Sequence, residues 1–276
     1  MTSIEILEAP PAATLQDAGR PGLLSRSIPP SGPLDPETHA AANRAVGNDE
    51  DAAAIEIPLG RLRIRALAEV LVSLDGRAPV LLGEGEEFVV EPGASAVRYL
   101  ALAGGIDVPL VLGSRSTLLT ARLGGLEGRP LRRGDRLSLL PRHEPHPLPA
   151  AVELPQASPD PAPLAVLPGP HLSRLAPAAV ELLLATEWQV GRIGDRVGVR
   201  LDGPKVPRDS LDLAGPIPMV RGAVQLTTDG TPIVLGPDHP ATGGYPVVLV
   251  LPRSAQARLA RLRPGKALRF VLQDAR

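Results

Sequence analysis

The most informative stretch of this sequence runs from Gly222 to Pro246. It contains Gln225, several threonines and aspartates, the pair Gly243-Gly244, and Tyr245. Glycine lets a backbone approach a ligand closely, and tyrosine carries a polar hydroxyl on an apolar ring. Two apolar, strand-like runs flank Asp229-Gly230, which is a favoured hairpin turn. The pattern therefore fits a ligand-contacting hairpin and a purely structural one equally well.

A loop rich in glycine and proline near the start also carries functional groups. The residues Gln16–Gly22 and Pro29–Asp35 present Asp17, Arg20 and Ser31 on a backbone with few available conformations. Functional groups held on rigid loops are a common site design. The structural alternatives are that Asp35 caps a following helix and that Asp17 pairs with Arg20.

Two further arginines lie beside polar residues. Arg115 stands between serines in Leu112–Thr117, where its planar fork suits a carboxylate or a phosphate. The alternative is a solvated loop in which Ser114 caps a short turn. Asp195 and Arg196 precede an apolar run and fit a structural ion pair as well as an anion site. Adjacent side chains on a strand point to opposite faces, so these two need not act together.

Composition excludes several kinds of site. There is no cysteine, and no Gly-x-x-x-x-Gly-Lys-Ser/Thr loop or Gly-x-Ser-x-Gly elbow occurs. The formal net charge of −1, with both signs interspersed, argues against a nucleic-acid partner. His143-Glu-Pro-His146 lies in a proline-rich segment without helical spacing, so we expect no metal site there. We interpret His39 and His239 as hydrogen-bonding residues rather than bases.

Proline density suggests where the chain divides. Prolines crowd the stretch from Pro141 to Pro163, where neither helix nor central strand is expected. The sequence predicts an N-terminal domain over 1–145, a linker over 146–163 and a C-terminal domain over 164–276. The amino terminus shows no signal peptide or membrane span, so a soluble cytoplasmic protein is expected.

Short strands with glycine or proline turns dominate both halves, which predicts barrels or sandwiches rather than a parallel α/β sheet. We expect strands over Ser3–Leu7, Arg61–Arg65, Glu69–Leu74, Glu86–Glu91, Val97–Ala103, Leu164–Leu167, Val197–Leu201, Ile233–Leu235 and Pro246–Leu251. Each half also ends in a turn followed by a strand. Helices are expected over Asp35–Gly47, Pro177–Ala185 and Arg253–Leu262. The predicted fold class is mainly β with a few short helices.

These segments together resemble the family of the 5-oxoprolinase C subunit, which is also described as biotin-dependent carboxyltransferase-like, allophanate hydrolase subunit 2-like, and related to a Kip anti-inhibitor. The matching motifs occur in the family's order at Gln16–Gly22, Pro29–Asp35, Ala103–Pro109, Gly113–Thr117, Gly169–His171, Trp188, Asp195–Gly203 and Gln225–Pro246. The sequence departs from the family at Pro237–Ala241, where Ala-Asp-x-Gln-Thr is common. This departure concerns the fine contacts to substrate.

The resemblance implies two cyclophilin-like β-barrel domains. It also implies an ATP-dependent 5-oxoprolinase complex that hydrolyses 5-oxo-L-proline to L-glutamate, with A-like and B-like subunits as partners. Mg would accompany ATP, and the absence of a P-loop places the nucleotide mainly on a partner. From the needs of this reaction we hypothesise that the anion clamps are Arg20, Arg115 and Arg196, and that the bases or ligands of metal-bound water are Asp17, Asp195 and Asp238. The expected substrate contacts are Ser31, Gln225, Thr242, Gly243, Gly244 and Tyr245.

Two other functions fit the same resemblance. One is a carboxyltransferase component like that of urea carboxylase. Its biotin would be on a separate carrier, because neither Lys205 nor Lys266 lies in an Ala-Met-Lys-Met context. The other is a non-enzymatic regulator that binds a kinase inhibitor. All three functions predict a stable complex with a B-like partner.

Overall fold

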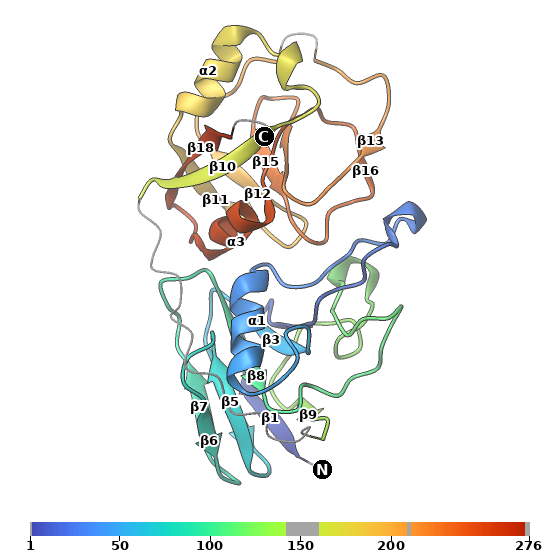
Figure 1. The fold of residues 1–276 in the computed structure, drawn as a ribbon, viewed down its shortest axis with the longest axis vertical. Coiled ribbons are helices and arrows are strands. Elements are labelled where there is room, and N and C mark those ends of the chain that lie inside the picture. The colour runs from blue at the N-terminus through green and yellow to red at the C-terminus, as the bar shows by residue number, and fades with distance from the viewer. Residues whose placement is uncertain (1, 142–159, 209–210, 274–276) are drawn as a thin grey trace. The chain divides into compact units, whose positions relative to one another are not determined.

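The computed structural model describes residues 2–141, 160–208 and 211–273, and Figure 1 labels the elements. Contacts divide them into two compact units. The first holds residues 2–21 and 31–141; the second holds residues 22–30 and those from 160 onward. The histidines at 143 and 146, and the predicted linker up to residue 159, lie outside the described residues.

The first unit contains two antiparallel sheets whose strand orders are β7-β4-β1-β9 and β2-β3-β8-β5-β6. Its strands are β1 (Ser3–Glu8), β2 (Thr14–Gln16), β3 (Ala54–Pro58), β4 (Leu62–Ala66), β5 (Val70–Leu74), β6 (Val80–Leu82), β7 (Glu87–Val90), β8 (Val97–Leu102) and β9 (Arg136–Ser138). One core unites them: Ile6 and Ile64 come from one sheet, and Ile55 and Leu100 from the other.

Strand β4 shows how the sequence selects these faces. Its apolar residues Leu62 and Ile64 are fully buried, while Arg63 and Arg65 alternate with them. Arg65 forms ion pairs with Glu5 of β1 and with a glutamate of β7. Exposed pairs of this kind contribute about 0–1 kcal/mol each, so the buried alternation determines the register.

Helix α1 (Pro36–Ala45) follows its local sequence signals. The Asp35 side chain accepts hydrogen bonds from the amides of Glu37 and Thr38, and Pro36 occupies the first turn. The helix packs against β8 and β5. A Cβ at Gly76, after β5, would lie 2.8 Å from the Ala41 Cβ, so glycine permits this close approach.

The second unit contains a closed barrel with strand order β10-β17-β14-β15-β12-β11-β18, completed by parallel pairing of β10 with β18. The strands are β10 (Ala162–Pro168), β11 (Trp188–Gly194), β12 (Gly198–Asp202), β14 (Ala223–Leu226), β15 (Pro232–Leu235), β17 (Val247–Val250) and β18 (Ala267–Leu272). A separate ribbon pairs β13 (Ile217–Pro218) with β16 (Thr242–Gly243). Helices α2 (Pro177–Ala185) and α3 (Arg253–Arg261) complete the unit, and 3-10 turns cover Leu24–Arg26 and Leu172–Arg174. A further 3-10 turn, Leu119–Ala121, belongs to the first unit.

Trp188, the only tryptophan, anchors the core of the second unit. It is fully buried, and its indole N–H donates to the Leu183 carbonyl of α2 at 3.0 Å. A Cβ at Gly203 would lie 2.7 Å from the indole ring. The glycine therefore gives the chain room to pass over the tryptophan.

The predicted mainly β class is confirmed, with a closed barrel in the second unit. The three predicted helices are present, and β14 and β15 form the hairpin predicted around Asp229-Gly230. Strand β10 begins at Ala162, two residues before the predicted start of the C-terminal domain. Segment 22–30, predicted within the first domain, groups with the second unit. No helix in the described ranges is long and apolar enough to cross a membrane.

Candidate functional site

Asp17 joins its own loop, which follows β2, to the loop that contains Ser114 and Ser116, both in the first unit. Its carboxylate accepts hydrogen bonds from the hydroxyls of Ser114 and Ser116 and from the amides of Gly19 and Arg115. Three of these donors bond Oδ1 and the Arg115 amide bonds Oδ2, so both carboxylate oxygens take part in holding the loops. The contacts show Asp17 holding the loops together, and its catalytic role stays a prediction.

Arg20 connects these two loops to a third loop, which contains Ser31. The side chain is 2% exposed and donates to the Ser31 hydroxyl at 3.0 Å and to the Ser116 carbonyl. A Cβ at Gly124 would lie 2.8 Å from the guanidinium, so that position also needs glycine. Arg115 is half-buried, and its Nε donates to the Val108 carbonyl at 3.0 Å. The structure thus brings the predicted residues Asp17, Arg20, Ser31 and Arg115 into one group of loops.

A buried Glu-Tyr pair holds the loop that contains Ser31. Glu56 on β3 accepts hydrogen bonds from the Leu34 amide at 2.8 Å and the Tyr99 hydroxyl at 2.7 Å. The same hydroxyl accepts from the Asp35 amide at 2.9 Å. Glu56 is 1% exposed and Tyr99 fully buried. Burial, and then the nearby Glu56 charge, raise the pKa of Tyr99 well above its usual value, so the phenol keeps its proton.

His39 of α1 packs beside this pair. Its ring lies edge-on to Tyr99 with the centroids 5.6 Å apart, and its Nε2 lies 3.0 Å from the Gln16 carbonyl. The imidazole is 2% exposed, and this burial lowers the pKa of His39 below 6.5. His239 behaves similarly: burial lowers its pKa, and its Nδ1 lies 2.9 Å from the Pro240 carbonyl. Both therefore serve as neutral hydrogen-bonding residues near pH 7.

The two buried histidines predict acid sensitivity. Below pH 6.5 the unfolded chain binds protons that the folded histidines resist, so the free energy of unfolding falls as the pH falls. The limiting slope is about 1.4 kcal/mol per pH unit for each histidine. Urea midpoints measured from pH 7.5 to 5.5 should decline below about 6.5, and His39→Asn should flatten that decline. A midpoint independent of pH over this range would contradict the prediction.

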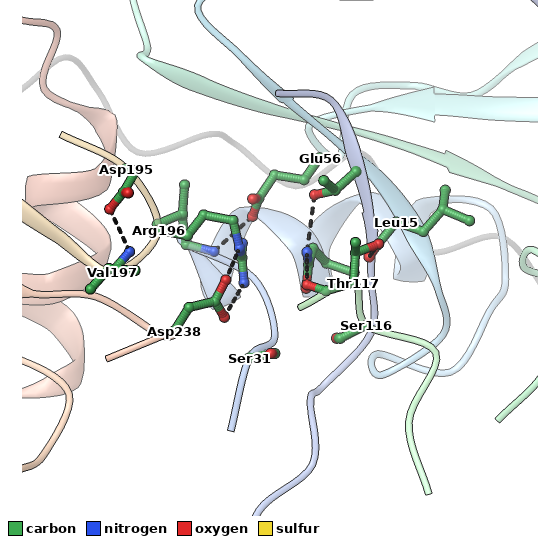
Figure 2. Close-up of polar contacts among 12 residues, drawn as sticks. Leu15, Ser31, Glu56, Ser116, Thr117, Asp195, Arg196, Val197 and Asp238 are labelled. Carbon is green, nitrogen blue, oxygen red and sulfur yellow. Dashed lines mark hydrogen bonds and ion pairs between the residues drawn. The ribbon is translucent and has the colours of Figure 1, made fainter. Parts of the chain in front are cut away.

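Arg196 and Asp238 form a buried ion pair in the second unit (Figure 2). Arg196 Nε donates to Asp238 Oδ2 at 2.8 Å and Nη2 donates to Oδ1 at 3.2 Å. The residues are 8% and 4% exposed, respectively. The Asp238 amide also donates to the Arg196 carbonyl at 3.0 Å. A Cβ at Gly236 would lie 2.3 Å from that carbonyl, so the loops approach closely. The pair is a rigid, charged feature built from two loops distant in sequence.

Asp195 serves a different purpose from its neighbour. Its side chain is exposed, and its Oδ1 accepts from the Val197 amide at 2.8 Å and the Gly198 amide at 3.2 Å. Figure 2 shows the Asp195–Val197 bond as separate from the contacts between Arg196 and Asp238. The carboxylate therefore shapes the turn into β12, and the ion pair of Arg196 is with Asp238.

Gln225 and Thr242–Tyr245 also come together in this unit. Gln225 is 6% exposed, and its amide donates to the Tyr245 carbonyl at 3.3 Å. Thr242 and Gly244 are exposed, and Tyr245 is 41% exposed. Gly243 lies directly against the amide, because a Cβ there would be 2.9 Å from Gln225 Nε2.

Comparison with known proteins identifies the family. A family model for the carboxyltransferase domain, subdomain A and B, matches residues 26–272. The chain belongs to the carboxyltransferase domain family. Among its relatives is the 5-oxoprolinase C subunit of Escherichia coli K12, which is 32% identical over 97% of this chain and 90% of the relative. The urea amidolyase of Lachancea kluyveri is also 32% identical, over 94% of this chain.

Family members differ greatly in length. The chain spans only 16% of the Lachancea urea amidolyase. The solved Kluyveromyces lactis urea carboxylase superposes with a TM-score of 0.90 at 30% identity, covering 99% of this chain and 27% of that one. The carboxyltransferase domain thus occurs as most of one relative and as a small part of others.

The buried pair of Glu56 and Tyr99 in this carboxyltransferase domain was not predicted from the sequence. Glu56 interrupts an apolar run, and an acidic residue in such a run is a signal for a buried carboxylate. Tyr99 is one of only two tyrosines and lies in a predicted strand. Their pairing joins residues far apart in sequence, so local pattern alone does not reveal it. In the described part of the chain, no three His, Asp or Glu residues group as a metal site.

Proposed function

We propose that this chain is the C subunit of an ATP-dependent 5-oxoprolinase, which opens the lactam of 5-oxo-L-proline to give L-glutamate. The observation that carries the proposal is the nearly end-to-end match with the Escherichia coli 5-oxoprolinase C subunit, over 97% of this chain and 90% of the relative. The urea amidolyases, in contrast, are much longer proteins, and the match covers only 16% of each. The relative is named as one subunit of several, which supports partners of the A and B kinds.

The reaction requires charge neutralisation more than covalent chemistry. An unactivated lactam is a poor electrophile, and ATP would activate it by phosphorylating its carbonyl oxygen. Water then adds to that carbon, the ring C–N bond breaks, and the nitrogen leaves as the amine, which gives an acyl phosphate. A second water hydrolyses this acyl phosphate to L-glutamate and inorganic phosphate, and ADP is the other product. A site for these steps must hold the substrate carboxylate and the developing negative charge, for which the arginine fork is well suited.

Arg196 is our candidate for the group that stabilises this charge. Its bidentate contact with Asp238 fixes the guanidinium, so no reorganisation is needed when charge develops. Asp17 and Arg20 hold the Ser31 and Arg115 loops, which we propose as a second set of polar contacts. The nucleotide, with Mg, is proposed to bind mainly on a partner.

The test is co-expression with the neighbouring A-like and B-like subunits. The complex should remain intact on gel filtration and release glutamate from 5-oxo-L-proline only with ATP. Omission of this chain is the control and should abolish the release. An intact complex without turnover, or equal turnover when this chain is omitted, would contradict the proposal.

A second function is supported by the superposition on urea carboxylase at a TM-score of 0.90. Under it, the chain would transfer a carboxyl group from carboxybiotin held on a separate carrier. Consumption of carboxybiotin, dependent on an acceptor and without ATP, would favour this function over the first. The same complex therefore serves both assays.

A further inference from the structure

The β13–β16 ribbon of the second unit has little backbone support. Its strands are two residues each, with Ile217 opposite Gly243 and Pro218 opposite Thr242. Proline has no amide hydrogen to donate. An isolated two-stranded ribbon is marginal even when it is longer than this. The Met219 amide also donates to the Ala241 carbonyl at 3.0 Å, and side chains beneath the ribbon add to this short backbone pairing.

Gln225 supplies such support, because it contacts both sides of the ribbon. Its Nε2 donates to the Tyr245 carbonyl at 3.3 Å and to the Met219 sulfur at 3.2 Å. Met219 follows β13, and Tyr245 follows β16. A side-chain amide has two N–H bonds, and both are directed at the ribbon.

The packing beneath the ribbon is close enough to require glycine. A Cβ at Gly243 would lie 2.9 Å from Gln225 Nε2 and 3.1 Å from the Met219 methyl carbon. Met219 itself is 1% exposed and belongs to a small apolar cluster with Val247. The underside of the ribbon is therefore closely packed, and Thr242, Gly244 and Tyr245 are its exposed residues.

His171 fixes the chain just beyond the ribbon. Its backbone amide donates to the Val247 carbonyl at 3.1 Å, and the Val247 amide donates to its ring Nδ1 at 3.1 Å. The same Nδ1 lies 3.2 Å from the Val247 carbonyl. Val247 lies two residues after Tyr245. The chain that follows the ribbon is thus held at Tyr245 by Gln225 and at Val247 by His171.

We infer that Gln225 is a positioning residue that acts through the ribbon, and that the exposed groups of Thr242–Tyr245 are the substrate contacts in this part of the second unit. The activity part of this inference rests on the proposed function. Under this inference Gln225 acts on the substrate indirectly, whereas the sequence analysis predicted a direct contact. The Thr242 hydroxyl and the Tyr245 phenol would bind the polar edge of a small lactam carboxylate.

Gln225→Met tests the positioning role, since it keeps the side-chain volume and removes both N–H donors. In the assembled complex, hydrogen exchange in peptides covering 241–247 should rise by about tenfold, because the local opening free energy falls. The KM for 5-oxo-L-proline should rise about fivefold or more with kcat changed by less than about twofold. Gln189→Met, at an exposed glutamine on β11, is the matched control and should change neither quantity.

Variants of the ribbon separate contact from positioning. Thr242→Ala and Tyr245→Phe should raise the KM while exchange in 241–247 stays at the wild-type rate. A raised KM in Gln225→Met with unchanged exchange would show direct substrate contact and overturn the inference. Unchanged KM in both ribbon variants would also overturn it. If the wild-type complex shows no turnover, the proposed function fails, and the exchange measurement alone still upholds or overturns the positioning role.

Discussion

Arg196→Ala is expected to lower turnover of the assembled complex by about a hundredfold or more, since removing one preorganised charge-stabilising group typically costs that much. It should also lower the free energy of unfolding by about 3–5 kcal/mol, because Asp238 then stays buried without its partner. Steady-state kinetics and urea unfolding measure the two effects. Arg200→Ala, at an exposed arginine on β12, is the matched control and should change neither.

A double variant separates catalysis from stability. Arg196→Met/Asp238→Leu replaces the ion pair with apolar side chains, a change that is often neutral or stabilising for buried pairs. We expect it to recover most of the stability lost in Arg196→Ala while turnover stays low. Recovery of turnover together with stability would show that Arg196 has only a structural role.

Tyr99→Phe is expected to destabilise the first unit by about 3 kcal/mol, because it leaves both the Asp35 amide and the Glu56 carboxylate without the hydroxyl. The loop that carries Ser31 should loosen with it. Urea unfolding measures the first effect, and proteolytic cleavage rates within residues 28–35 measure the second.

The other tyrosine provides the control for this experiment. Tyr245 is 41% exposed, so Tyr245→Phe should change the free energy of unfolding by less than about 0.5 kcal/mol. If the two Tyr→Phe variants had equal stability, the Glu56–Tyr99 pair would not hold the loop. Glu56→Gln should be milder than Tyr99→Phe, since the amide oxygen still accepts hydrogen bonds.

Elements with strong local signals were predictable from the sequence. Helix α1 has its cap at Asp35, proline at its first position and Gly47 beyond its end, and each signal acts within a few residues. Strand β4 alternates apolar and charged residues, so its buried face can be predicted without knowledge of the partner strands.

Strands whose character depends on their neighbours were missed. Strand β3 contains Glu56 between two isoleucines, and its burial between β2 and β8 is a tertiary property. Strand β11 contains Gly191 and Gly194, which read locally as turn residues. A Cβ at Gly191 would lie 2.7 Å from the Arg200 carbonyl, so the glycine is required by the pairing itself.

The candidate site was predictable as a set of loops but not as a set of contacts. The sequence marked Asp195 and Arg196 as neighbours, yet the partner of Arg196 is Asp238, which is 42 positions away. Likewise, Asp17 bonds to serines almost a hundred residues later. Such contacts form only when distant segments come together in the folded chain. Composition and residue spacing therefore do not predict them.

The most direct test of the central claim is an add-back titration. Purified chain is added to a preparation of the A-like and B-like partners, and ATP-dependent glutamate release from 5-oxo-L-proline is measured. We predict no release without the chain, and a rate that rises with added chain until it saturates at a fixed ratio. Release that is independent of the added chain, or absent from the saturated complex, would contradict the assignment as the 5-oxoprolinase C subunit.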